Sequence, residues 1–457
     1  MSDPSELELK QDRLDALVAS GDLEGLSDAV VAMDLHPSDV ADLLEELDRE
    51  EQIVVVRSLP TELASEALSE MEEGDERGEL LAALDPRKGA ELLHELADDD
   101  AADLIAELGP EEANRILANL PVEEAVDLRG LLQYDEETAG GIMTTDLVAI
   151  PASLTTDQAI VQIRQQGQEV DDFYTVFVVD GGNRLLGTVP LADLILAEPG
   201  ARVSELVEEV LFTVLPDTDQ EEVGRLMARY NVVSAPVVNA AGQLLGRITF
   251  DDIIDVIEAE QTEDILRLAG VSEDEEVRAD WRDAVRTRLP WLGLNLVTAI
   301  VAASVVLLFE STLARFWYLA MFMPVIAGMG GNSGTQALAV TVRRIALASS
   351  PFERRTDAVT KELLVGLVNG IVLGLVAAGL VWAATAAGAD LPARLPLVVL
   401  LALWGNIFLA GTAGAFIPTL LDRLGVDPAV ASSVFLTTVT DLVGFALLLG
   451  LATSVLT

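Results

Sequence analysis

The feature that most constrains the fold is an abrupt change of composition near residue 288. The whole net charge of −48 lies in residues 1–288, because the eight acidic residues beyond that point are matched by eight basic ones. From residue 289 onward, five apolar stretches are long enough to cross a bilayer, at about 289–309, 314–341, 362–387, 395–420 and 428–455. The sequence therefore predicts an acidic water-soluble part followed by a five-helix membrane domain.

Basic residues near the ends of these stretches predict the orientation in the membrane. Nine of them precede the first stretch or follow the second and fourth, whereas only Arg315 and Arg394 lie on the other side. Cytoplasmic loops carry the excess of Lys and Arg, and residues 1–30 lack the basic start and apolar core of a signal peptide. We expect a multi-pass protein of the cell membrane with a cytoplasmic N-terminus and an external C-terminus.

The composition also limits the metal chemistry. The chain has no Cys, and its only histidines are His36 and His94, so thiolate and multi-histidine transition-metal sites are excluded. A bound metal would have oxygen ligands, which suit magnesium or calcium. The acid excess alone does not indicate ion binding, because the solvated surface of a protein from a high-salt cytoplasm has the same character.

The acidic part divides into two regions with different periodicity. In residues 1–135 the apolar residues recur at helical spacing, and "HPSDVADLLEEL" (36–47) is echoed by "DPRKGAELLHEL" (85–96) and "DDDAADLIAEL" (98–108). Repeated short amphipathic helices bury one face against their neighbours. This pattern predicts an all-α superhelical domain.

A second repeat, with an offset of 59 residues, follows. "FYTVFVVDGGNRLLG" (173–187) matches "VVSAPVVNAAGQLLG" (232–246), and each copy reads as helix, buried strand, turn, strand and helix. This α/β pattern resembles a tandem pair of CBS domains over residues 137–256, a module that is usually regulatory. Residues 257–288 continue as a long acidic connecting helix, and residues 289–457 form the membrane domain.

One membrane stretch contains an unusual polar and glycine-rich segment, "MPVIAGMGGNSGTQALAV" (323–340). Pro324 removes an amide, and the glycines remove side chains from the next two turns. Exposed backbone at membrane depth is tolerated where it lines a water-filled path, but glycines also serve close helix packing. We leave both interpretations open for this segment, whose small residues are Gly328, Gly330, Gly331 and Gly334.

The last stretch contains Asp441, the only ionisable side chain well inside any of the five. An Asp at a helix centre costs about 2.5–3.5 kcal/mol on insertion scales, so it normally marks a polar path or a functional partner. Thr437, Ser433 and Gly444 share its helix face. A twofold dimer would place two such carboxylates around one axis, where they could hold magnesium through its water shell.

Together these residues resemble the MgtE family of magnesium transporters over nearly the whole chain. The most specific elements are "PVIAGMGGNSGTQ" and the Asp in the fifth span. The resemblance implies that two subunits form a pore lined by spans two and five. It implies that Asp441 holds hydrated magnesium, with the backbone carbonyl near Thr437 and the side chain of Asn332 as neighbours. The implied pore-lining residues are Pro324, Gly328, Gly330, Gly331, Gly334, Ser433 and Gly444.

The resemblance also implies feedback by cytoplasmic magnesium, bound by acids of the helical domain, the CBS pair, the connecting helix and the loop before span five. The matching residues are Asp99, Asp103, Glu221, Asp252, Asp255, Glu260, Glu263, Asp264 and Asp427. Each has a simpler alternative as a solvated acid, and Asp427 could cap the following helix. Asn231 stands where an acid is expected in the family, which weakens the site there.

The predicted function is a homodimeric channel that carries hydrated magnesium into the cytoplasm down its electrochemical gradient and is closed by cytoplasmic magnesium. An alternative is a membrane-anchored CBS-type ion or nucleotide sensor without transport. A CBS-bearing chloride channel fits less well, because those proteins have more spans and place the CBS pair after them. No enzyme constellation or phosphate-binding loop is recognisable. No nucleic-acid partner is expected, and ATP in the CBS cleft stays open, as does the preference among magnesium, cobalt, nickel and calcium.

Overall fold

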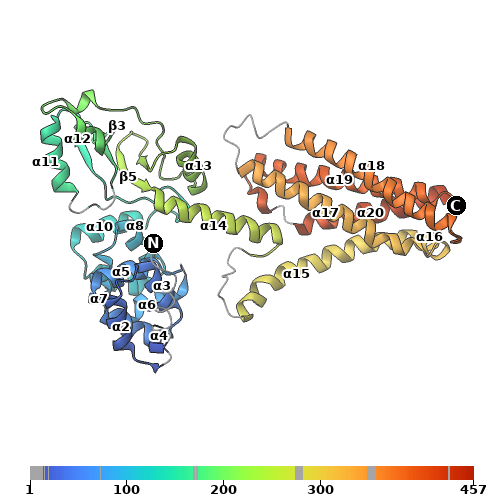
Figure 1. Cartoon of the computed structure of the whole chain (residues 1–457), viewed down its shortest axis with the longest axis horizontal. Helices are drawn as coiled ribbons and strands as arrows, with labels where there is room; N and C mark the ends of the chain where they lie inside the picture. The colour runs from blue at the N-terminus through green and yellow to red at the C-terminus, as the bar shows by residue number, and fades with distance from the viewer. Residues whose placement is uncertain are drawn as a thin grey trace. The chain divides into compact units, whose positions relative to one another are not determined.

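The structure is a computed structural model that describes residues 14, 16–18, 20–72, 74–167, 170, 173–272, 281–346, 357–430 and 433–456. The chain divides into two compact units, Met1–Ile257 and Glu258–Thr457. Figure 1 shows short helices and small sheets in the first unit, and long helices in the second. Each unit is described by itself below.

The helical domain is built from short helices. Each helix packs against the helix two positions further along the chain, so that α2 packs on α4, α3 on α5, and so on to α8 on α10. Two layers of helices result, which confirms the predicted superhelix. The helices are α2 (Leu23–Ala32), α3 (Pro37–Glu45), α4 (Arg49–Ser58), α5 (Thr61–Ser69), α6 (Asp75–Ala83), α7 (Pro86–Leu93), α8 (Asp98–Ala106), α9 (Pro110–Leu117) and α10 (Val122–Leu131).

The sequence echoes in this domain correspond to equivalent helix starts. In α3 and α7 a proline occupies the first turn, and the side chain of the preceding residue, His36 or Asp85, accepts a hydrogen bond from a backbone amide of that turn. Proline has no amide to satisfy there, and the cap pairs one of the free donors. The adjacent leucines of the two helices, Leu43 and Leu44 in α3 and Leu92 and Leu93 in α7, are buried.

A buried ion pair joins three helices of this domain. Arg77 of α6 is only 4% exposed, and its Nη2 lies 2.7 Å from Oε1 of Glu107, directly after α8. The same guanidinium donates from Nη1 to the carbonyl of Ser69 at 2.9 Å. The pair therefore joins the ends of three helices.

The CBS pair contains two small sheets with matching irregularities. In the first copy β1 pairs with β2 in parallel, and β2 pairs with β3 antiparallel; in the second copy β4 and β5 are antiparallel. The register shifts between Val178 and Val179, and again 59 residues later between Val237 and Val238. The elements are β1 (Ala149–Pro151), α11 (Thr156–Gln166), β2 (Thr175–Val179), β3 (Leu185–Pro190), α12 (Leu191–Leu196), η1 (Val203–Glu205), α13 (Gln220–Tyr230), β4 (Ser234–Val238) and β5 (Leu244–Thr249).

The connecting segment is helical at both ends. α14 (Phe250–Ala269) ends where Gly270 adopts a left-handed backbone with φ of 74°, a conformation that favours glycine after a helix. α15 (Trp281–Ser304) follows in the second unit, Glu258–Thr457, which is called the membrane unit below. The part of the predicted connecting helix between residues 273 and 280 lies outside the described residues.

The membrane unit is a bundle of long helices around α19, which packs against α17, α18 and α20 (Figure 1). Within the described residues, four segments are long and apolar enough to cross a membrane: Ala284–Arg315, Val359–Ala386, Leu395–Leu424 and Val434–Leu456. α17 is not among them, although it has 28 residues. The elements are η2 (Val305–Phe309), α16 (Glu310–Arg315), α17 (Leu319–Ala346), α18 (Asp357–Ala386), α19 (Leu395–Leu424), η3 (Pro428–Val430) and α20 (Ser433–Leu456).

The predicted fold class is confirmed as a helical domain, a CBS pair and several apolar helices, and the count of five spans is approximate. The polar segment of α17 explains the difference. Its glycines, Asn332, Ser333 and Gln336 lower the hydropathy of a helix whose other face packs inside the bundle. A helix that lies within a bundle need not be apolar all round.

Replacing Arg77 tests the buried ion pair. Arg77→Ala leaves the Glu107 carboxylate largely buried without its cation, which costs about 3–5 kcal/mol. We expect hydrogen exchange in α6 and α8 of the full chain to accelerate by about a hundredfold or more. The matched control is Arg57→Ala, which removes an exposed arginine of α4 and should leave exchange unchanged. Unchanged protection in Arg77→Ala would contradict the assigned role of the pair.

Candidate functional site

Acidic side chains gather where the helical domain meets the CBS pair within the first unit. Asp99 and Asp100 come from the first turn of α8, and Asp251 and Asp252 from the first turn of α14. All four line a cavity of about 280 Å³. Acids are favourable in a helix's first turn because the free amides there carry partial positive charge. Two helix starts therefore bring the four carboxylates to one cavity.

The neighbouring Asp98 anchors this arrangement. Its carboxylate accepts hydrogen bonds from the Thr145 amide, at 3.0 Å to Oδ1 and 3.1 Å to Oδ2, and from the hydroxyl of Thr144. These contacts join α8 to the segment that precedes β1. Opposite, the Asp252 carboxylate accepts from the amide of Thr249 at 3.3 Å and from its hydroxyl. The acids around the cavity are thus held by defined partners.

The electrostatics of the cluster are unfavourable without a cation. Asp99 is 7% exposed, and burial, followed by the charge of Asp252, raises the pKa of its carboxyl well above the ordinary range. Burial and Asp252 also raise the pKa of Asp100 to about 7, against the lowering effect of Arg77. Burial likewise raises the pKa of Asp252. A divalent ion in the cavity would offset this repulsion and favour the ionised forms.

The structure brings together some of the predicted sensor acids of this unit. Asp99 and Asp252 interact electrostatically and line the same cavity. Asp103 lies half-buried further along α8, and Asp255 lies exposed one turn beyond Asp252. Glu221 is exposed in the first turn of α13 and is not a lining residue of the cavity.

Sequence reasoning missed two members of the cluster, Asp100 and Asp251. Each lies next to a predicted residue in a run of acidic residues. These runs were the sequence signal for the cluster, but they do not show which of their side chains face the cavity. In the part of the chain that the structure describes, no three His, Asp or Glu side chains are arranged to hold a metal ion as they stand.

A second charged group lies in the other unit, between the end of α14 and the loop before α20. Arg267 forms ion pairs with Glu263, one turn away, and with Asp427 in the loop. Burial, followed by the charge of Asp427, raises the pKa of Asp264, whereas Arg343 and Arg267 lower it. Glu260 lies half-buried on the same helix. The predicted acids here therefore surround an arginine that the sequence analysis did not single out.

Asp427 caps a helix, as the simpler alternative predicted, and also takes part in an ion pair. Its Oδ1 accepts a hydrogen bond from the amide of Ala429 at 2.8 Å, which caps the short helix η3. Its other oxygen is the one that pairs with Arg267. The carboxylate thus stabilises the conformation of the loop and also joins the loop to α14.

The membrane unit places Asp441 near the middle of α20, half-buried. No basic side chain of the described residues contributes an electrostatic interaction to it. Thr437 precedes it by one turn, and its carbonyl accepts from the hydroxyl of Thr440 at 3.0 Å. Ser433 begins the helix, but its side chain lies outside the described residues.

The glycine-rich segment of α17 crosses α20 in antiparallel register. A Cβ on Gly334 would lie 2.9 Å from Leu436, and one on Gly331 would lie 3.9 Å from the hydroxyl of Thr440. Close packing therefore accounts for Gly334. In contrast, Gly328 has nothing within 4 Å of such an atom, and Pro324, Gly328 and Asn332 are exposed on the single chain. The segment thus has a packed face and an uncovered face.

Glu362 is another residue that sequence reasoning missed. It lies near the start of α18, only 7% exposed, with Oε1 3.5 Å from Nζ of its neighbour Lys361. No local pattern indicates its burial, because an acid at the edge of an apolar stretch is typical of a side chain that reaches the aqueous boundary.

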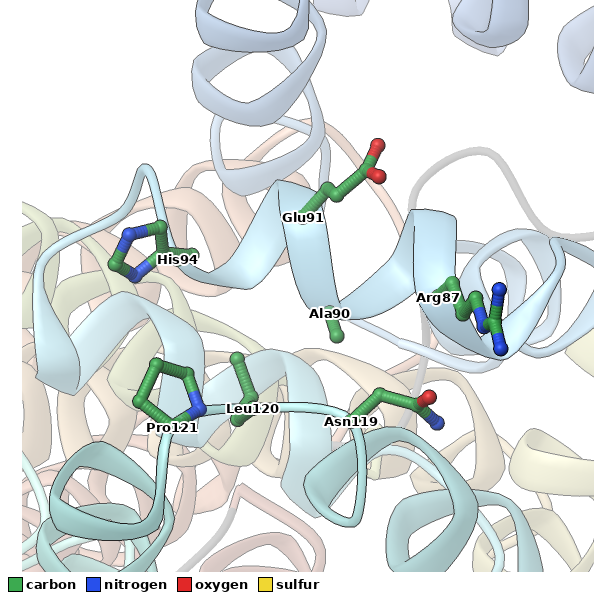
Figure 2. Close-up of a pocket in the computed structure, with 7 residues that line it drawn as sticks. All are labelled: Arg87, Ala90, Glu91, His94, Asn119, Leu120 and Pro121. Carbon is green, nitrogen blue, oxygen red and sulfur yellow. The ribbon is translucent and has the colours of Figure 1, made fainter.

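The helical domain also contains a cavity of about 310 Å³ that none of the predicted site residues lines. Figure 2 shows Arg87, Glu91 and His94 of α7 and its end, with the Asn119–Pro121 segment beneath them. His94 Nδ1 lies 2.9 Å from Oε2 of Glu124. The cavity is a groove between neighbouring repeats of the superhelix.

Comparisons with known proteins agree with this architecture. The MgtE model, described as a divalent cation transporter, matches residues 323–451, and the MgtE intracellular N domain model matches residues 35–137. The CBS domain model matches residues 139–200 and 203–259, which confirms the predicted pair.

Individual relatives extend the likeness to the whole chain. The magnesium transporter MgtE of Thermus thermophilus is 35% identical over 450 residues, 96% of this chain and 97% of its own. That of Enterococcus faecalis is 39% identical over 69% of this chain and 68% of its own. The crystal structure of the cytosolic domain of the Mg2+ channel MgtE in complex with ATP has a TM-score of 0.50 and 36% identity, and covers 53% of this chain and 98% of that one.

The raised pKa of Asp100 predicts a pH dependence. Its native pKa of about 7 exceeds the ordinary 3.8, so the native state holds the proton more tightly than the unfolded chain. The resulting stability is fully present below about pH 4 and is lost as the pH rises through about 7. We expect Asp100→Asn to raise the melting temperature at pH 8 by a few degrees in metal-free buffer, and by less at pH 5.

Thermal denaturation of the full chain measures this effect, with Asp39→Asn, an exposed acid of α3, as the matched control. Magnesium should raise the melting temperature of the wild type at pH 8 more than that of Asp100→Asn. An equal effect of Asp100→Asn at both pH values would contradict the prediction.

Proposed function

Because the chain belongs to the MgtE family of magnesium transporters, we propose that it is a homodimeric channel in which Asp441 of each subunit receives hydrated Mg2+ on its way into the cytoplasm. The protein is a multi-pass membrane transporter and not an enzyme. The finer statements on the dimer, the path and its control are our proposal.

The observation that carries the proposal is that Asp441 lies in an apolar helix and forms no ion pair with any of the described residues. Its burial costs about 2.5–3.5 kcal/mol on insertion scales unless water or a cation compensates. The helix also offers the half-buried Thr437 one turn away, and α17 offers the exposed Asn332. A hydrated divalent ion between two such faces would meet carboxylate, carbonyl and amide oxygens, the ligands that magnesium prefers.

A second subunit would complete the path. One carboxylate is too little for a divalent ion, whereas two around a twofold axis supply two charges at one height in the membrane. The exposed face of the α17 segment, with Pro324, Gly328 and Asn332, would then turn toward the axis. No coupling ion is needed, because a divalent cation gains roughly 2 × 2.3 kcal/mol on crossing about 100 mV.

We also propose the orientation expected from the basic loops, with the N-terminus in the cytoplasm. Both acidic groups would then meet cytoplasmic magnesium. The cavity around Asp99 and Asp252 would bind the ion, which would draw α8 and α14 together. The group around Asp264 and Asp427 would respond in the same way at the loop before α20.

The CBS pair is proposed to take ATP as a further ligand. The support is the 36% identity with the cytosolic domain of the Mg2+ channel MgtE, which was crystallised in complex with ATP. No observation favours the alternative of a sensor without transport, since the relatives that match nearly the whole chain are magnesium transporters.

Removal of the proposed ion ligand tests the pore. Asp441→Ala should abolish magnesium uptake into proteoliposomes, because no other described side chain replaces the carboxylate at that height. Asp390→Ala, which removes an exposed acid between α18 and α19, is the matched control and should transport normally. Uptake at the wild-type rate by folded Asp441→Ala would overturn the proposed path.

Removal of the proposed sensor acids tests the feedback. In single-channel recordings with magnesium varied on the cytoplasmic face, the double variant Asp99→Asn/Asp252→Asn should need a several-fold higher concentration for closure. Asp157→Asn, an exposed acid of α11, should close like the wild type. A wild-type open probability that stays constant over the millimolar range would remove the feedback proposal and leave the pore proposal standing.

A further inference from the structure

Asn406 of α19 is the most deeply buried amide side chain in the membrane unit among the described residues, with an exposed fraction of 0%. Its Nδ2 donates to the backbone carbonyl of Ile326 in α17 at 2.8 Å. That carbonyl lies two residues after Pro324, where α17 lacks an amide. The contact therefore joins α19 to α17 on the C-terminal side of this proline.

Two glycines make the room that this amide occupies. A Cβ on Gly330 of α17 would overlap Nδ2 of Asn406, and a Cβ on Gly444 of α20 would lie 2.9 Å from the same atom. The amide thus fills a slot between α17 and α20. Gly444 lies three residues after Asp441, so the slot is one helical turn from the carboxylate.

Packing alone does not account for an asparagine in this slot. Its Oδ1 is buried and accepts no hydrogen bond from the described residues. An unpaired buried acceptor costs about 1–3 kcal/mol, and a leucine of similar size would fill the slot without that cost. The donated hydrogen bond to Ile326 is the property that leucine lacks. The side chain therefore supplies a directional contact at the expense of stability.

We propose that Asn406 is a positioning residue of the ion path, which holds the polar segment of α17 in register with Asp441 of α20. The hydrogen bond sets the height and rotation of α17, and the two glycines let both helices approach the same amide. Loss of this contact would let α17 shift against α20 and change how the oxygens around Asp441 meet the ion. This inference rests on the proposed function and adds a residue that does not touch the ion.

Magnesium uptake into proteoliposomes by the full chain, measured over a range of magnesium concentrations, tests this role. Asn406→Leu keeps the volume and removes the donor, so we expect the half-saturating concentration to rise about three- to tenfold, the range of one interhelical hydrogen bond. Discrimination against calcium should fall in the same variant. Asn369→Leu, which replaces an exposed asparagine of α18, is the matched control and should change neither value.

A conservative variant separates positioning from a merely structural role. Burial raises the pKa of a carboxyl group, so at low pH the side chain of Asn406→Asp is neutral and can donate its O–H to the Ile326 carbonyl in place of the amide, whereas at higher pH it ionises and loses this donor. Its half-saturating concentration should therefore match the wild type at low pH and rise relative to the wild type as the pH increases. If Asn406→Leu does not fold, Gly444→Ala, which displaces the same amide, should produce the shift.

The result that overturns the inference is an unchanged half-saturating concentration and unchanged calcium discrimination in Asn406→Leu, with uptake normalised to folded dimer. A change in maximal rate or yield alone would overturn it equally. Failure of the proposed function would look different, because the wild type itself would then show no uptake that Asp441→Ala abolishes.

Discussion

The structure of the membrane unit depends on one constraint, the cost of an ionisable group inside an apolar helix. α20 carries Asp441 near its middle, and none of the described basic residues neutralises it. Such a carboxylate persists only where water or a cation reaches it. We propose that the exposed polar face of α17 and the threonines of α20 meet that requirement, whereas Gly334 serves close packing of the two helices.

The same physics operates in the acidic cluster of the first unit, with a different outcome. Asp99, Asp100 and Asp252 lie close together at two helix starts, and burial, followed by the repulsion of neighbouring carboxylates, raises their pKa values. In the second unit Arg267 already supplies a cation to Glu263 and Asp427. A bound cation would therefore stabilise the ionised carboxylates around Asp99 and Asp252. The acids around Asp427 are already partly neutralised by Arg267.

Much of this architecture could be predicted from the sequence because it follows from periodicity. The 59-residue repeat predicted the CBS pair, whose two copies have equivalent strand irregularities in the structure, and the leucine echoes predicted the superhelix. Hydropathy located the apolar helices but did not show that α17 has a polar face as well as an apolar one. A helix that packs in a bundle on one face can be polar on the other.

The contacts between distant segments could not be predicted. Arg267 lies in an acidic run, where composition suggests repulsion, and only the fold brings it to Asp427, 160 residues away. Asn406 hydrogen-bonds between helices, but its slot between Gly330 and Gly444 depends on three helices at once. Pairings of this kind are properties of packing, and no local pattern encodes them.

The most direct test of the central claim asks whether water and magnesium reach the face of α20 beside Asp441. Because the chain has no cysteine, Thr437→Cys creates a single thiol one turn from the carboxylate. We expect a membrane-impermeant, positively charged methanethiosulfonate reagent to modify this thiol and magnesium to slow the reaction. If the thiol stays unmodified under conditions in which the exposed control Asp390→Cys reacts completely, water and ions do not reach this face of α20 and the proposed path is wrong.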